Sequence, residues 1–226
     1  MNKSIAGIVV AVLVVGGVAA FALSSNDDTS NDTSNDVTTS EVQSTEISAG
    51  DLRVALNNAL REHVELAGVS LRNVFTESPD TGAAVAALDA NSVEVAGLVG
   101  SVYGEDAEES FLDLWRAHIT FFANYTAAAR DGDTEKMDEA KVDLMGYGEA
   151  ASNFFESANP NLPKSAVMPL LEEHRDLVIA TIDLIGAGDF EAAYVKLGEA
   201  ADQVNKIGDA LAGGIAAQMP EKFSDQ

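Results

Sequence analysis

The sequence contains no cysteine, and this absence excludes several kinds of chemistry at once. A chain without thiols forms no disulfide bonds, builds no thiolate zinc site and has no cysteine nucleophile. Histidine is nearly as rare, with only His63, His118 and His174 in 226 residues. Packing alone must therefore hold the fold together, and any imidazole chemistry depends on these three side chains.

Positive charge is also scarce. Lysine and arginine number 13 against 37 aspartate and glutamate residues, which gives a formal net charge of −24 at pH 7. Such a surface repels nucleic acids and anionic lipid headgroups, so we expect no nucleic-acid partner. It is typical of an acidic surface that keeps a protein soluble, and it also attracts cations and basic partners.

The common catalytic signatures are missing as well. No H-E-x-x-H, G-x-S-x-G or P-loop motif occurs in the sequence. A di-iron carboxylate bundle needs a glutamate three residues before a ligating histidine, but the three positions hold Leu60, Trp115 and Leu171. We therefore expect a protein that is not an enzyme.

The N-terminus carries a long apolar run. Residues 5–23 contain no charged side chain, and a helix of this length spans the ~30 Å hydrocarbon core of a bilayer. Because Lys3 precedes the run, the positive-inside rule predicts that residues 1–23 are a single-pass anchor in the cell membrane, with the rest outside. Alternatively, Ala20-Phe21-Ala22 is a signal-peptide cleavage site and the protein is secreted. The length of the run favours the anchor, and both interpretations predict an extracytoplasmic domain.

Residues 24–48 form a low-complexity tract rich in Asn, Asp, Ser and Thr. A tract with so few apolar residues cannot offset the entropy lost on ordering, so we expect a disordered acidic linker. The remaining residues 49–226 have the length of one domain.

The histidines are spaced by 55 and then 56 residues, which indicates an internal repeat. Apolar residues recur with helical periodicity at about 51–75, 81–103 and 106–130, and again from 133, 163 and 189. Asp133 and Asp189 are good N-caps, Gly104 is a helix stop, and Pro163 suits the first turn of the fifth helix. We therefore predict an all-α fold without a sheet. It is a six-helix bundle of three repeated antiparallel hairpins (about 51–104, 105–158 and 163–213), preceded by one transmembrane helix.

Each histidine has apolar neighbours one helical turn away. The neighbours are Leu60 and Ala67 for His63, Trp115 and Phe122 for His118, and Leu171 and Val178 for His174. Residues at these spacings share a helix face, so all three imidazoles are predicted to point into the core. A buried neutral ring needs a hydrogen-bond partner or a ligand, and the candidate partners are Asn91, Tyr147 and Asn153.

Two interpretations of the histidines stay open. In the first, each histidine is a satisfied core residue that fixes the packing of its hairpin. In the second, His63, His118 and His174 form a metal site for copper or zinc, because imidazole is a common ligand of both metals. The second interpretation requires that the hairpins pack around a common axis, which the spacing leaves open.

Six segments form a recognisable set: Glu62–Ala67, Leu88–Asn91, Ser101–Gly104, Phe111–Ile119, Phe122 with Tyr125, and Gly188–Tyr194. They resemble a poorly characterised secreted bacterial helical-bundle domain found in proteins described in connection with copper amine oxidase. The similarity runs from about Leu52 to Val204. Relatives carry a further His-Met pair after the last motif, whereas this chain has neither residue in Glu199–Val204. The resemblance implies export and an all-helical fold, and no amine oxidase activity.

These patterns together predict a membrane-tethered, extracytoplasmic helical-bundle domain that binds or scaffolds in the cell envelope. Its candidate partners are the membrane, through the N-terminal helix, and an envelope protein. The alternative is an envelope metal-binding protein that holds copper or zinc through the three core histidines. A third hypothesis is the ligand-sensing domain of a signalling partner.

Overall fold

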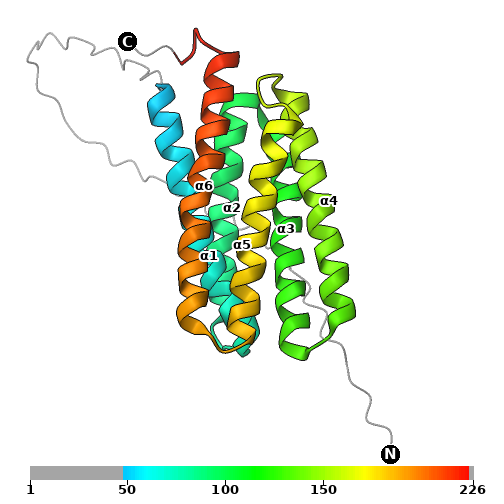
Figure 1. Ribbon diagram of the computed structural model, residues 1–226. Helices are drawn as coiled ribbons and strands as arrows, with labels where there is room; N and C mark the ends of the chain where they lie inside the picture. Colours follow the sequence, from blue (N-terminus) through cyan, green and yellow to red (C-terminus); the bar gives the residue numbers. More distant parts are fainter. Residues whose placement is uncertain (1–47, 224–226) are drawn as a thin grey trace, which may run out of the picture. The chain divides into compact units, whose positions relative to one another are not determined.

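The computed structural model describes residues 48–223, and within that range the chain is entirely helical, with six α-helices and no strand (Figure 1). The helices are α1 (Ala49–Thr76), α2 (Thr81–Tyr103), α3 (Glu105–Asp131), α4 (Thr134–Ala158), α5 (Lys164–Gly186) and α6 (Phe190–Gln218). The predicted all-α class and the number of helices are confirmed. The predicted anchor at 1–23 and nearly all of the predicted linker at 24–48 lie outside the described residues.

Local sequence signals set the ends of the helices. The side chains of Asp133 and Asp189 accept hydrogen bonds from the backbone N–H groups of the third residue after each, at 3.1 Å, as predicted for N-caps. Gly104 ends α2 with φ at +91°, a conformation that a residue with a side chain rarely adopts. Pro163 stands just before α5 rather than in its first turn, because its extended backbone serves as the N-cap.

The six helices form a closed ring. Each helix packs against the next along the chain, and α6 packs back against α1, so that the ring has no open edge. The odd-numbered helices α1, α3 and α5 also contact one another across the middle of the ring. The centre of the bundle is therefore built by the three helices that carry the histidines.

One apolar core fills the ring. Its most deeply buried large side chains include Tyr125, Ile182 and Val64, whose exposed fractions are at most 1%. The Tyr125 hydroxyl donates to Asp183 Oδ1 at 2.7 Å, which satisfies the one polar atom of an otherwise apolar side chain. Close packing of this kind fixes the axial position of each helix, and thus the height at which each histidine sits.

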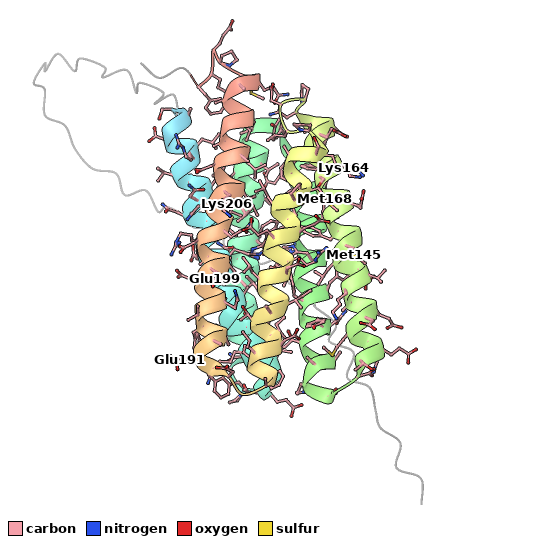
Figure 2. All side chains as sticks on the ribbon, viewed as in Figure 1. Met145, Lys164, Met168, Glu191, Glu199 and Lys206 are labelled. Atoms are coloured by element: carbon pink, nitrogen blue, oxygen red, sulfur yellow. The ribbon has the colours of Figure 1, made fainter. Side chains whose placement is uncertain are left out.

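Charged side chains lie on the outside of the bundle, as those of Glu191, Glu199 and Lys206 along α6 illustrate (Figure 2). Lys206 pairs with Glu173 on α5 at 2.8 Å. The best-formed pair joins α3 to α2, where Arg116 donates two hydrogen bonds to Asp89 at 2.7 and 2.9 Å. Exposed pairs contribute at most about 1 kcal/mol each, so the core supplies most of the stability.

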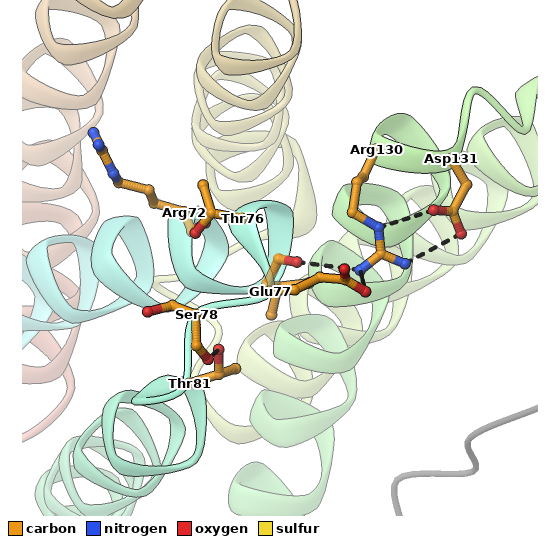
Figure 3. Close-up of polar contacts among 8 residues, drawn as sticks. Arg72, Thr76, Glu77, Ser78, Thr81, Arg130 and Asp131 are labelled. Carbon is orange, nitrogen blue, oxygen red and sulfur yellow. Dashed lines mark hydrogen bonds and ion pairs between the residues drawn. The ribbon is translucent and has the colours of Figure 1, made fainter.

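Arg130 ties the end of α3 to the end of α1 (Figure 3). Its guanidinium pairs with the neighbouring Asp131 at 2.8 Å and with Glu77 at 3.2 Å. Glu77 ends α1 in the left-handed conformation, with φ at +52°. The ion pairs therefore hold the turn after α1 against the C-terminal end of α3.

Among the described helices, α2 is the one long and apolar enough to cross a membrane by length and composition. Its two consecutive buried polar residues, Asn91 and Ser92, make hydrogen bonds inside the bundle.

Candidate functional site: the histidine core

The three central helices bring the histidines to one level of the core. His63 on α1 and His118 on α3 are 4% and 3% exposed, and their Nε2 atoms lie 3.4 Å apart. His174 on α5 is half-buried and lines the same two cavities as the other two rings. The prediction that the imidazoles point inward is confirmed for His63 and His118, and His174 lies beside them at the edge of the cavities.

Aromatic side chains hold the first two imidazoles in place. The Trp115 ring lies 4.7 Å from that of His63 and 4.6 Å from that of His118, between ring centroids. Tyr147 stacks on His118 with a centroid separation of 4.7 Å and an interplanar angle of 28°. Because Trp115 and Tyr147 pack closely around the pair, the rings have little freedom to turn.

The separation of the two Nε2 atoms is informative. Hydrogen bonds between protein nitrogen and oxygen atoms are usually 2.7–3.2 Å long, so 3.4 Å is long for a hydrogen bond between the two rings. Two nitrogens that bind one tetrahedral zinc ion at 2.0–2.1 Å are about 3.3–3.4 Å apart. The pair already has the spacing of one edge of a tetrahedral metal site.

All three histidines are neutral at physiological pH. Burial, together with repulsion from His174, lowers the pKa of His63 to about 3. Burial lowers the pKa of His174 to about 4. For His118, burial and repulsion by the other two imidazoles keep the pKa well below its usual value. Neutral imidazole is the form that binds metals, so protons do not compete for these nitrogens near pH 7.

Two buried amides face the histidines in the same way. Asn91 on α2 donates through Nδ2 to the Ala59 carbonyl at 3.0 Å, and Gln203 on α6 donates through Nε2 to the Leu170 carbonyl at 2.8 Å. Each of these carbonyls belongs to the residue four positions before a histidine. These hydrogen bonds from the amide nitrogens fix the orientation of both side chains. The amide oxygens take no part in them.

Those amide oxygens and the Nδ1 atoms of the histidines are buried without a hydrogen bond of good geometry. Polar contact with Asn91 acts to raise the pKa of His63, and contact with Gln203 does the same for His174. A contact that favours the protonated ring is one in which an imidazole N–H faces an acceptor oxygen. We infer that Nδ1 carries the proton in His63 and His174, which leaves their Nε2 lone pairs free.

The structure corrects the predicted partners of the histidines. Asn91 and Tyr147 do contact them, but Asn153 is exposed on α4 and was wrongly chosen. Gln203 was missed. A signal for it exists in the sequence, because Tyr147 follows Asn91 by 56 residues and Gln203 follows Tyr147 by 56, which is the spacing of the histidines themselves.

A complete metal site is not assembled within residues 48–223. No three side chains of His, Cys, Asp or Glu in that range are grouped closely enough to hold one ion. The geometry supplies two nitrogens in place and a third imidazole, His174, on the wall of the same cavities. The predicted metal role of His63, His118 and His174 stays a prediction.

A cavity of about 30 Å³ connects this cluster with the outside of α5. Its inner wall includes the three histidines, Trp115 and Tyr147, and its outer wall includes Glu172 and Arg175. The Trp115 indole N–H has no hydrogen-bond partner, and Glu172 is exposed. The cavity has the polar rim and room for one or two water molecules that an ion would need on its way inward.

Comparison of the chain with protein-family models, with curated proteins and with solved structures gives no match.

The inferred tautomers are open to direct measurement. We expect ¹⁵N NMR spectra of the metal-free protein to show His63 and His174 as neutral rings protonated at Nδ1. Neither ring should titrate between about pH 8 and pH 5, because burial holds their pKa values near 3 and 4. Protonation at Nε2, or titration near the ordinary value of about 6.5, would contradict the assignment.

The buried histidines should also make stability depend on pH. Below about pH 6.5 the unfolded chain protonates its histidines while the folded chain does not, so the unfolded state binds more protons. As the pH is lowered, the free energy of unfolding should then decrease by about 1.4 kcal/mol per pH unit for each histidine. This decrease should continue until the pH reaches the lowered pKa values of the folded protein. Urea denaturation of the wild type and His118→Gln between about pH 6 and 5 measures this. The variant should have the shallower slope, and equal slopes would count against neutral burial.

Proposed function

We propose that this protein is a membrane-tethered, extracytoplasmic binding module, and that the ligand of its helical bundle is a transition-metal ion, copper or zinc. The ion binds at the histidine core, with Nε2 of His63 and Nε2 of His118 as the first two ligands. The observation that carries this proposal is the 3.4 Å separation of those two atoms, which suits one edge of a tetrahedral site.

The surroundings of the two rings support metal binding. A metal-ligating histidine usually donates its other ring N–H to an oxygen, which fixes the tautomer and makes the ligating nitrogen more basic. Asn91 is placed to play this part for His63, and Gln203 for His174.

His174 is the natural third ligand. It already lines both cavities beside the pair. The fourth position falls to water or a bound molecule, as in open metal sites.

The acidic surface also favours the binding of a metal ion. A net charge of −24 raises the local concentration of cations around the protein. Glu172 stands where the smaller cavity reaches the surface, so a cation meets a carboxylate before the neutral histidines. We infer that this cavity is the path by which the ion reaches the core.

The proposal includes a threefold architecture and a tether. Three hairpin repeats would explain why His63, His118 and His174 come to the centre on every second helix. They would also explain why Asn91, Tyr147 and Gln203 follow the histidines by 28, 29 and 29 residues. The apolar run at residues 5–23 would hold the bundle outside the membrane. The motifs of common enzyme classes are absent from the sequence, which supports binding rather than catalysis.

Metal titration of the full-length protein in detergent, after treatment with EDTA, tests the proposal. We expect one Zn²⁺ or Cu²⁺ per chain by isothermal titration calorimetry. Asn91→Leu should weaken binding by about ten- to a hundredfold, the usual effect of losing a residue that orients a ligand. His63→Gln and His118→Gln should weaken it by more.

Leu52→Ala is the matched control. Leu52 is 3% exposed and lies eleven residues before His63 on α1, about 16 Å along the helix. The substitution destabilises the core without touching the site, so metal affinity should be unchanged. If no stoichiometric binding occurs, or if binding survives in both histidine variants, the histidines are core residues that fix the packing.

A further inference from the structure

A second cavity, of about 50 Å³, leads away from the histidines along the inside of the bundle. His63, Ala67, Ser70 and Val74 on α1 all line it, and these positions share one helix face over eleven residues. The cavity therefore extends for about three turns of α1, roughly 16 Å, from the histidine level toward the turn after α1. It is long and narrow rather than round.

The lining of this cavity contains no charged residue. Apart from the neutral histidines, its polar side chains are Ser70 and Thr181, and the rest are apolar residues such as Leu88, Phe122 and Val178. A charged ligand would lose its hydration here without a counter-ion in return. Only an uncharged and largely apolar molecule suits the space.

Ser70 differs from the other buried hydroxyl residues in its hydrogen bonding. It is 3% exposed and its Oγ has no hydrogen-bond partner. Other buried helical hydroxyls behave differently: Ser92, Thr126 and Thr181 each donate to the carbonyl four residues earlier, at 2.8 to 2.9 Å. An unpaired buried hydroxyl is costly, by about 1–3 kcal/mol in general. Its position on the cavity wall offers one hydrogen bond to whatever occupies the space.

We propose that this cavity binds a small uncharged molecule with an apolar chain and one hydrogen-bonding group, of the class of short aliphatic alcohols, aldehydes and ketones. The chain lies among the apolar residues and the polar atom pairs with Ser70 Oγ. The volume corresponds to about four water molecules, which suits a ligand of four or five heavy atoms. The site does not depend on the proposed metal, although it ends at the same histidines.

Two probes of equal size separate the contributions of the chain and of the hydroxyl. 1-Butanol and n-pentane both have five heavy atoms, and only the first forms hydrogen bonds. Each is added to the full-length, EDTA-treated protein, and binding is followed through the methyl NMR signals of Leu88 and Val178. We expect both probes to shift these signals, with saturation, and 1-butanol to bind more tightly.

Ser70→Ala should weaken the binding of 1-butanol by roughly five- to tenfold, the value of one hydrogen bond, and leave n-pentane within about twofold. Ser92→Ala is the matched control, since Ser92 is equally buried but bonds to its own helix outside the cavity. It should change neither affinity. The proposal is overturned if neither probe binds, or if Ser70→Ala leaves the affinity for 1-butanol unchanged. Because no metal is present, the result is independent of whether the histidines bind one.

Discussion

The structure depends on one constraint: three imidazoles must be kept neutral in an apolar core that offers them too few hydrogen bonds. Helices α1, α3 and α5 each bring one ring to the centre, and the Nδ1 atoms of all three lack a well-formed partner. Buried polar atoms without partners cost stability. Leucine at each of these positions would avoid that cost, and the proposed metal site accounts for histidine in its place.

The neighbouring side chains reduce that cost in stability and fix the orientation of the rings. Trp115 packs beside both His63 and His118, and Tyr147 stacks on His118. Asn91 and Gln203 place amide oxygens beside His63 and His174. The effect is to leave Nε2 lone pairs in the centre, between two cavities of different character. One cavity has a charged rim at the surface, and the other is apolar with a single free hydroxyl. A metal ion and a small neutral molecule would thus reach the same cluster through different cavities.

The sequence predicted the helices well because the signals for them are local. Apolar periodicity, the caps at Asp133 and Asp189 and the stop at Gly104 all act within one turn. It could not predict how closely the rings approach, since that depends on the axial position of helices far apart in the chain. Asn153 was a wrong choice because it lies six residues after Tyr147, about 240° around the helix axis from it. Gln203 was overlooked because its signal in the sequence is not local: it is the 56-residue step that leads from Asn91 through Tyr147.

The central claim is that Nε2 of His63 and Nε2 of His118 are two ligands of one metal ion. Anomalous diffraction from zinc-loaded crystals, measured on both sides of the zinc absorption edge, tests it most directly. The account predicts one peak in the centre of the bundle, about 2.0–2.1 Å from both atoms. A core without a peak, with zinc bound only to surface carboxylates, would contradict it and leave the three histidines as packing residues.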